Sequence, residues 1–478
     1  MTMTPRFGTL LAMVAAAALA GCASSGASSD ASSALASATT QLPPQWQAPL
    51  PHTGQLTDLA RWWQQFDDPL LSPLIDAAQA ASPSIASAAS RIEQSRAARV
   101  GAGAALLPSL NASASAQRAR QDFVTPLGTS SSVGLQAAWE LDVFGGARAG
   151  RDAAQARLEG AQAGWHDARV AVAAEVATTY VSLRACEAQA EQVHADTNSR
   201  AETARLTDLA ARAGFQSPGN AALSRASAAQ GQVSLTQQRA QCDLLVKSLV
   251  ALTALPEPAL RSQLASGTGR VPQPAQIAIE TVPAQALAQR PDLADAARAV
   301  LAASADVTQS QAQRYPRITL GGSIAAARYE ASSLSGDGMV WSVGPVQLTL
   351  PIFDGGTRTA NVDAARARFE EAGALYRGQL RNAVREVENA LIALQSTADR
   401  STDAQIASDG FAASLRATDS RYRGGLGTLF ELEDARRSAV AAQIALIDLQ
   451  RERVSAWIAL YRALGGGWSD AAARTAAR

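Results

Sequence analysis

Residues 132–157 read SVGLQAAWELDVFGGARAGRDAAQAR, and residues 342–368 read SVGPVQLTLPIFDGGTRTANVDAARAR. The shared Ser-Val-Gly lies 210 positions apart (342 − 132), the Gly-Gly pair also 210 (355 − 145), and the Asp-Ala-Ala run 211 (363 − 152). Each stretch passes from alternating apolar residues through a Gly-Gly turn into a long segment without proline. The near-constant offset predicts an internal two-fold repeat whose unit is strand, turn and helix.

Alternation with a period of two predicts a strand in each copy. Every second residue is apolar from Val133 to Val143, and the second copy alternates in a similar way from Val340 to Ile352. A weaker strand candidate precedes each of these, at residues 109–122 and 317–330, across a Gly/Ser-rich loop. Segments of roughly 11–14 residues are long enough to cross a bilayer at a tilt. We expect two hairpins, and hence four strands, in each chain.

A long helix that turns back on itself follows each Gly-Gly pair. Residues 148–212 form one unbroken segment, roughly 95 Å long at ~1.5 Å per residue, before a glycine cap at Gly214 and a helix start at Ser217-Pro218. In the second copy, Gly424-Gly425 ends the helix and Thr428-Leu429-Phe430-Glu431 has the order of a capping box. Apolar residues at heptad spacing predict coiled-coil seams. They are Leu380, Val384, Val387, Leu391, Leu394, Val440, Ile444, Ile447, Val454, Ile458 and Tyr461.

Four strands cannot close a sheet inside a membrane. Unpaired strand edges would leave backbone groups unsatisfied in hydrocarbon, and closed bacterial barrels begin at about eight strands. Several chains must therefore share one barrel, and about twelve strands, from three chains, would leave more room for a conducting interior than eight.

The N-terminus has the order of an export signal. Arg6 precedes a short apolar run that ends in Leu19-Ala20-Gly21-Cys22, which resembles a bacterial lipoprotein signal. That resemblance implies cleavage after residue 21 and covalent lipid on Cys22, and Ala23 in the next position implies sorting to the outer membrane. The alternative is an ordinary signal with an incidental cysteine. Residues 22–54 then form a lipid-anchored, flexible segment.

Two further cysteines, Cys186 and Cys242, lie 28 positions on either side of Gly214 (214 − 186 and 242 − 214). If the two helices run antiparallel, these cysteines could face each other and form a disulfide in an oxidising compartment. The alternative is two small buried thiols on separate faces.

Several motifs resemble those of the outer-membrane factors, the TolC-like trimeric channels, and most closely the lipoprotein branch that serves RND-type efflux pumps. The resemblance covers about residues 55–468. The motifs are Trp62-Trp63-Gln64-Gln65-Phe66-Asp67-Asp68-Pro69-Leu70, Trp139-Glu140-Leu141-Asp142-Val143-Phe144-Gly145, Leu287-Ala288-Gln289-Arg290-Pro291-Asp292-Leu293, Leu350-Pro351-Ile352-Phe353-Asp354-Gly355-Gly356 and Tyr422-Arg423-Gly424-Gly425.

The resemblance implies an α+β membrane protein, in which a trimeric twelve-stranded antiparallel β-barrel is continued by a long α-helical coiled-coil barrel in the periplasm. It implies the outer-membrane channel of a tripartite pump that exports drugs or other small toxic compounds. The implied partners are two further copies of the chain, a periplasmic adaptor protein, an inner-membrane RND transporter and outer-membrane lipid. A type I protein-secretion outlet is the alternative. The expected segments are a first repeat at 55–260, a connecting equatorial segment at 261–285, a second repeat at 286–468 and a tail at 469–478.

Equivalent aspartates, Asp208 and Asp419 (419 − 208 = 211), lie close to the ends of the two long helices, where they oppose the helix dipole. We expect them to form rings of carboxylates at a periplasmic gate, with Leu415 sharing the face of Asp419. The alternative is solvated aspartates balanced by nearby arginines, namely Arg205, Arg212, Arg421 and Arg423. By resemblance the adaptor would dock at the tip turns that follow, at Gly214, Phe215, Gly425 and Leu426; the alternative is that these turns are only helix caps.

An enzyme is the rival class, and the residue inventory argues against it. Lys247 is the only lysine and follows no glycine-rich loop, so no P-loop is present. His166 and His194 would lie roughly 42 Å apart on one helix at ~1.5 Å per residue. We expect no cofactor or metal beyond the covalent lipid. With 42 acidic and 42 basic residues, the chain offers no net charge to attract nucleic acid. A passive adhesion trimer, a third class, would not need two strand hairpins.

Overall fold

The computed structural model describes residues 31–33, 35–36, 47, 59–120, 127–274, 287, 289–331 and 334–468. The chain divides into two compact units. The first comprises Met1–Gln41, Ala89–Ala163 and Ala294–Gln379, and the second comprises Leu42–Ala88, Gly164–Leu293 and Leu380–Arg478. Each unit therefore draws on both sequence copies. The predicted signal, Cys22 and the tail 469–478 lie outside the described residues.

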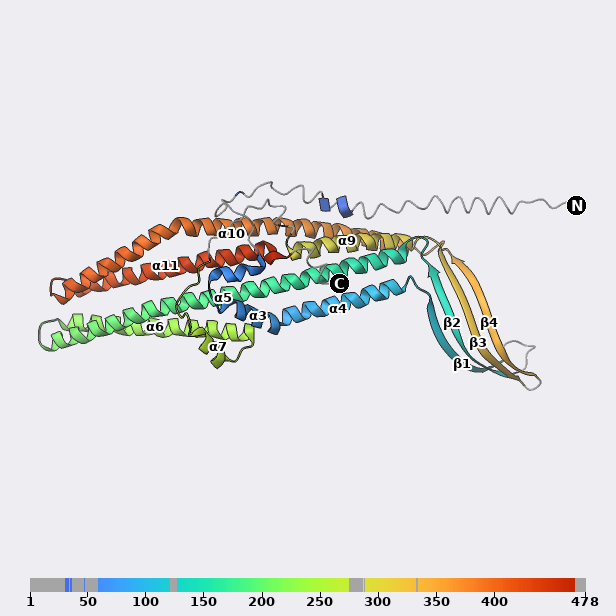
Figure 1. The fold of residues 1–478 in the computed structure, drawn as a ribbon, viewed down its shortest axis with the longest axis horizontal. Coiled ribbons are helices and arrows are strands. Elements are labelled where there is room, and N and C mark those ends of the chain that lie inside the picture. Colours follow the sequence, from blue (N-terminus) through green and yellow to red (C-terminus); the bar gives the residue numbers. More distant parts are fainter. Residues whose placement is uncertain are drawn as a thin grey trace. The chain divides into compact units, whose positions relative to one another are not determined.

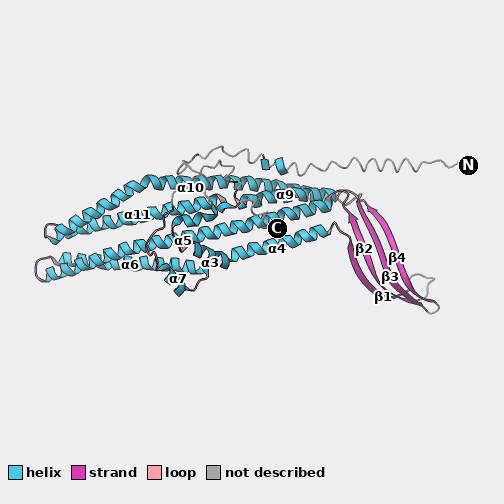
Figure 2. Ribbon diagram, viewed as in Figure 1, coloured by secondary structure: helices cyan, strands magenta, loops and turns pink. Residues whose placement is uncertain are grey.

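The strands of the first unit form one antiparallel sheet in the order β1-β2-β3-β4 (Figure 2). They are β1 at Ser109–Ala119, β2 at Gly128–Leu141, β3 at Arg317–Ala331 and β4 at Leu334–Thr349. The four predicted strands are present, but their ends were partly wrong. Gly128 pairs with Ala119 and Ala331, so the ladder extends into the stretch predicted as a Gly/Ser-rich loop, and β4 likewise begins earlier and ends at Thr349.

The register gives this sheet one apolar and one polar face, since directly opposite residues project to the same side. Trp139 of β2 lies opposite Leu320 of β3, which lies opposite Val346 of β4. On the other face, hydroxyls meet across strands at 2.9 Å, Ser115 with Ser132 and Ser323 with Ser342. The apolar face comprises Leu110, Val133, Leu135, Trp139, Ile318, Leu320, Ile324, Trp341, Val346 and Leu348. The polar face comprises Asn111, Ser113, Ser115, Ser132, Gln136, Thr319, Ser323, Ser342 and Gln347.

Two helices of 67 residues each, α5 (Gly146–Arg212) and α10 (Thr357–Arg423), are the longest elements (Figure 1). Both ends of α10 lie 211 positions after those of α5 (357 − 146 and 423 − 212). Each long helix is followed by a returning helix, α6 (Pro218–Thr253) or α11 (Leu429–Ala463), so the predicted hairpins are confirmed. The shorter elements are η1 (Leu59–Phe66), α3 (Leu71–Ala81), α4 (Pro83–Ala104), α7 (Glu257–Leu264), α9 (Pro291–Ala312) and η2 (Gly465–Gly467). Of the helices in the described ranges, none has the length and apolar content needed to cross a bilayer.

An aspartate caps the start of each long helix. The Asp142 carboxylate accepts hydrogen bonds from the backbone amides of Ala147 (3.0 Å) and Arg148 (2.9 Å), and Asp354 accepts from those of Gly356 (3.0 Å) and Arg358 (3.1 Å). Burial by itself raises the pKa of Asp142, but the amide bonds and the Arg148 guanidinium outweigh it, so this pKa lies below its usual value. Asp142 follows directly on the end of β2, whereas Pro351, which has no amide hydrogen to donate, lies between the end of β4 and Asp354.

Aromatic side chains form the centre of the core in the second unit. Trp62 is fully buried and meets Trp457 with ring centroids 6.1 Å apart, and Trp63 meets Tyr461 at 4.7 Å. Leu391 and Leu394 of the predicted heptad seam are buried in the same cluster. The Trp-Trp motif thus anchors the N-terminal segment on α11.

Candidate functional site at the helical tips

The two tip turns have the same backbone construction. In the first, the amide of Phe215 donates to the carbonyl of Ala210 (2.8 Å) and that of Gly214 to Ala211 (3.0 Å); in the second, Leu426 donates to Arg421 (2.9 Å) and Gly425 to Tyr422 (3.0 Å). This is the Schellman pattern, which requires a residue with positive φ. Gly214 has φ 78° and Gly425 has φ 73°. The predicted caps are confirmed, and both turns lie at the same end of the second unit (Figure 1).

Each turn presents one large apolar side chain to solvent. Phe215 is 84% exposed and Leu426 is 78% exposed. They occupy the same place in the two motifs, directly after the positive-φ glycine. Phe430, in the first turn of α11, is 72% exposed and adds to the apolar surface of the second tip.

The helix N-termini that follow are capped as predicted. The Ser217 hydroxyl accepts from the amide of Asn220 at 3.1 Å, and Thr428 with Glu431 forms a complete capping box. Such caps stabilise the start of a helix by typically about 1 kcal/mol each.

The two aspartates near the tips form ion pairs within their own helices. Asp208 lies 2.6 Å from Arg212, and Asp419 lies 2.9 Å from Arg423. An acid four residues before a base is the favourable order, and the arginine complements the helix dipole that the aspartate opposes. The aspartate side chains are 30% and 26% exposed, and the arginines 76% and 67%. Leu415 is partly buried.

The other two arginines considered for this balance have different partners. Arg205 pairs with Glu202 at 2.7 Å, and Arg421 lies 4.0 Å from Glu431. Of the four arginines considered, Arg212 and Arg423 therefore pair with the aspartates, and Arg205 and Arg421 do not.

The sequence interpretation missed the contacts that join the two hairpins near their tips. The hydroxyls of Thr207 on α5 and Tyr422 on α10 lie 3.0 Å apart. Further along, buried Arg436 of α11 donates to Thr203 of α5 at 2.7 Å. Tyr422 begins the Tyr-Arg-Gly-Gly motif, but nothing in the sequence pattern indicated that Thr207 is its partner.

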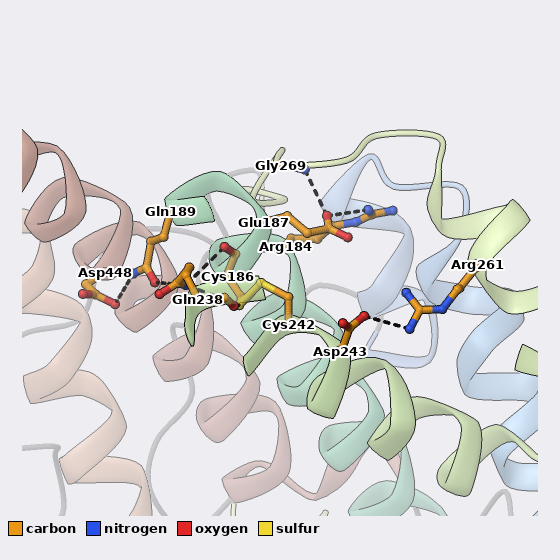
Figure 3. Close-up of a disulfide and its surroundings, with 10 residues drawn as sticks. All are labelled: Arg184, Cys186, Glu187, Gln189, Gln238, Cys242, Asp243, Arg261, Gly269 and Asp448. Carbon is orange, nitrogen blue, oxygen red and sulfur yellow. Dashed lines mark hydrogen bonds and ion pairs between the residues drawn. A yellow bond between two sulfur atoms is a disulfide. The ribbon is translucent and has the colours of Figure 1, made fainter. Parts of the chain in front are cut away.

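A disulfide joins the first hairpin 28 residues from its tip. Cys186 of α5 and Cys242 of α6 are bonded, with Cα atoms 5.6 Å apart (Figure 3). Of the two arrangements that the sequence left open, the structure therefore contains the bond.

A buried arginine next to this disulfide organises a polar network that the sequence did not indicate. Arg184 is fully buried; its guanidinium donates to the carbonyls of Leu264 (2.9 Å) and Ser266 (2.8 Å), to the Tyr180 hydroxyl (3.0 Å) and to Glu187 (2.8 Å). The Tyr180 hydroxyl in turn donates to Asp68 at 2.7 Å, and burial followed by this bond raises its pKa. Asp68 of the Trp-Trp motif is thus tied to α5 and, through Arg184, to the end of α7.

No cluster of three metal-ligating side chains occurs within the described ranges. The geometry at the tips is that of an apolar and ionic surface on paired hairpins, which suits contact with another protein or control of a pore.

Comparisons with known proteins agree with this architecture. The family model described as outer membrane efflux protein matches residues 74–255 and 282–466. The pyoverdine export outer membrane protein OpmQ of Pseudomonas putida is 31% identical over 443 residues, covering 89% of this chain and 92% of that protein. The solvent efflux pump outer membrane protein SrpC of the same species is 30% identical over 424 residues, covering 86% and 88%.

A solved structure shares the fold. The open state of the MtrE outer membrane channel from Neisseria gonorrhoeae superposes with a TM-score of 0.76 at 26% identity, covering 90% of this chain and 96% of that one. The resemblance predicted from the motifs is confirmed. The chain belongs to the outer membrane efflux protein family.

Proposed function

We propose that the protein is the outer-membrane channel of a tripartite RND-type efflux pump, which carries drugs or other small toxic compounds from a periplasmic tunnel to the exterior. The relatives SrpC and OpmQ are named for solvent efflux and pyoverdine export, which favours small molecules over the proteins of a type I secretion outlet. An inner-membrane RND transporter and a periplasmic adaptor would complete the pump.

One observation carries the channel proposal: a four-stranded sheet with an apolar face, a polar face and two free edges. Within the described ranges β1 pairs only with β2, and β4 only with β3. In hydrocarbon such edges must be paired. Because the strands alternate in direction, β4 of one copy can pair antiparallel with β1 of the next. Three copies would close a twelve-stranded barrel, with the apolar face toward lipid and the hydroxyl-rich face toward the lumen.

The helices would continue this barrel as a periplasmic tube. A 67-residue helix is ~100 Å long, far more than a compact core can enclose. The equal lengths of α5 and α10, and the constant spacing of their ends, support a duplication of residues 55–260 and 286–468 around a connecting segment at 261–285. Three chains would then supply six similar hairpins around the tube.

Attachment to the outer membrane would be reinforced by lipid on Cys22, after removal of residues 1–21. The Phe215 and Leu426 tips, with their glycine turns, would receive the adaptor, since exposed apolar side chains at equivalent positions suit a repeated protein contact.

The function can be tested on protein purified from outer-membrane fractions. We expect a complex of three copies of the processed chain, each lighter than the 49.5 kDa of the full sequence, that conducts ions in planar bilayers. Cells that lack the gene should accumulate a fluorescent apolar dye faster, with an unchanged set of secreted proteins. A monomeric, non-conducting protein would refute the channel, and loss of secreted proteins without dye accumulation would favour the secretion outlet.

At the tips we propose a gate formed by Asp208, Leu415 and Asp419 of three chains. The aspartate–arginine pairs are partly exposed, and exposed pairs hold weakly, so the carboxylates remain able to act on passing ions. We expect Asp419→Ala to raise single-channel conductance and to lower the preference for cations, because it removes three carboxylates from one ring.

Asp409→Ala is the matched control for this gate, since it removes the same charge from an exposed position on the same helix. It should change neither property. If Asp419→Ala behaves like the control, the aspartates are helix-end ion pairs only.

A further inference from the structure

The disulfide lies where the first hairpin passes from dense to sparse packing. On α6, Val246 and Leu249 are buried in the main core of the second unit. From there toward the tip, the next buried residues are Leu235, Gly231, Ser224 and Ala221, which are mostly small. Half-buried Cys242 stands between these two regions, so its bond to Cys186 attaches α6 covalently at the start of the sparsely packed arm. Beyond it, α6 meets α5 through hydrogen bonds such as that from the Thr197 hydroxyl to the Gly231 carbonyl at 3.0 Å.

The part of α5 around Cys186 also contacts the segment around α7 (Figure 3). Glu187 accepts from the amide of Gly269 at 3.0 Å, one residue from the disulfide. On α6, Asp243 pairs with Arg261 of α7 at 2.8 Å, again one residue from the disulfide. This pair is exposed, 43% on the arginine and 59% on the aspartate, and therefore holds weakly in water. Leu249 of α6 is buried in the same core cluster as Leu260 and Leu264 of α7, so the disulfide adds a covalent link between α5 and α6 to apolar packing.

A third helix joins at this level. Gln189 of α5 donates to Asp448 of α11 at 3.1 Å and accepts from Gln238 of α6 at 3.1 Å. Hydrogen bonds through Gln189 therefore link α6 to α11 of the second hairpin, and Figure 3 shows the three residues involved.

The second hairpin has no such bond. The positions equivalent to the two cysteines, 211 residues on, are Thr397 and Arg453. Near this level, α10 and α11 are joined by the ion pair of Arg400 and Glu452 at 2.7 Å, whose side chains are 53% and 44% exposed. The two halves of the repeat thus differ: at this level the first hairpin has a covalent bond between its helices, whereas the second has an exposed ion pair beside the buried residues Leu394 and Val454.

We propose that the Cys186–Cys242 disulfide is a redox-dependent clamp on the channel. When oxidised, it fixes α6 on α5 at the start of the sparsely packed arm; when reduced, it lets this arm of α6 move relative to α5 and loosens the tube wall, while Arg184 still holds the end of α7 on α5. The clamp itself follows from the contacts above, and its effect on conductance rests on the proposed function. Cys186 is only 6% exposed and Cys242 is half-buried, so Cys242 is the sulfur that a dithiol can reach.

The reaction is a thiol–disulfide exchange. A thiolate of a dithiol reductant attacks Sγ of Cys242, the bond between the two protein sulfurs breaks, and its electron pair leaves on Cys186, which takes up a proton. The second thiol of the reductant then closes the reductant's own disulfide and releases Cys242 as a thiol. Two electrons and two protons have passed to the protein, and an oxidising thiol–disulfide oxidoreductase of the periplasm would reverse the exchange.

The test compares the purified full-length channel before and after dithiothreitol. We expect reduction to increase amide hydrogen exchange at least about tenfold in peptides covering residues 221–242, the arm of α6 on the tip side of the disulfide, since local opening governs exchange. Peptides from the same level of the second hairpin should be unchanged. Single-channel conductance should rise at least about twofold. The variant Cys186→Ser/Cys242→Ser should reproduce the reduced state and no longer respond to dithiothreitol. If this variant does not fold, the comparison of the wild-type protein before and after reduction is sufficient to test the clamp.

Glu452→Gln is the matched control, because it breaks the exposed ion pair at the same level of the second hairpin and should leave exchange at 221–242 as in the wild type. Unchanged exchange after verified reduction would overturn the clamp. Faster exchange with unchanged conductance would overturn its regulatory role. A wild-type protein that never conducts would count against the proposed channel. The change in amide hydrogen exchange on reduction would test the clamp independently of that result.

Discussion

Replacing Arg184 with methionine is expected to destabilise the second unit by about 3–5 kcal/mol, the usual cost of removing one partner of a buried charged network. The arginine is fully buried, and it satisfies two backbone carbonyls, a tyrosine hydroxyl and a carboxylate at once. Methionine fills much of the volume but donates nothing. The carbonyls of Leu264 and Ser266 would be left without this donor, and an unsatisfied buried acceptor costs about 1–3 kcal/mol.

The measurement is the thermal midpoint of the purified protein, followed by the helical signal in detergent. Arg184→Lys should recover only part of the loss, since an ammonium keeps the charge but cannot match the fork of the guanidinium. Arg205→Met is the matched control on the same helix, because its ion pair with Glu202 is exposed, and its midpoint should equal that of the wild type. A midpoint for Arg184→Met as high as that of the control would mean that this network does not hold α7.

The sequence was sufficient for the elements because their signals are local. Heptad spacing, glycine at positive φ and hydroxyl caps each depend on a few neighbouring residues, and α10, Gly214 and Thr428 lie where those signals predicted. The strand ends were less predictable. Gly128 and Leu334 belong to strands because a partner backbone pairs with them, and no pattern within their own segments records that partner.

The polar network around Arg184 could not be predicted from the sequence, for a physical reason. Arg184 and Arg436 are buried, whereas Arg205 is exposed, yet all three are arginines on long helices. Burial of a charge depends on which helix packs beside it, and that is settled by contacts across 80 or more positions, such as Arg184 with Leu264. Arg290 directly precedes the start of α9 at Pro291, and its pairing with Glu386 at 2.8 Å joins residues 96 positions apart (386 − 290), which no local pattern indicates.

The disulfide shows an intermediate case. The symmetric spacing of Cys186 and Cys242 around Gly214 made them plausible neighbours once the hairpin was assumed. Spacing alone could not say which face of each helix the sulfurs occupy, so two arrangements stayed open until the helices were placed. The disulfide also contributes to the thermal midpoint of the protein. In the chain-entropy model, closing the loop between Cys186 and Cys242 stabilises the folded state by ~4 kcal/mol, so the Arg184 variants should be compared with the disulfide oxidised.

Placing an arginine at Ile324 should abolish assembly of the channel in the membrane. Ile324 lies at the middle of β3 and on the apolar face, opposite Leu135 and Trp341. On the lipid side of a barrel, a charge at the bilayer midplane costs about 2–4 kcal/mol, and a trimer would carry that cost three times. We expect the trimer band to disappear from outer-membrane fractions in semi-native electrophoresis.

Ser323→Arg is the matched control, because it puts the same charge at the same depth on the opposite face. It removes one hydroxyl contact, that with Ser342, but the arginine would project into a water-filled lumen, where its solvation is retained. The trimer should form normally and its preference for cations should fall, since three positive charges would line the pore. If Ser323→Arg abolished the trimer and Ile324→Arg did not, the hydroxyl-rich face would be the one toward lipid. Equal loss of the trimer in both variants would show that the sheet is not part of a barrel with a water-filled lumen on one side. The pair therefore tests closure and orientation together, because only a closed barrel gives two neighbouring residues such different surroundings.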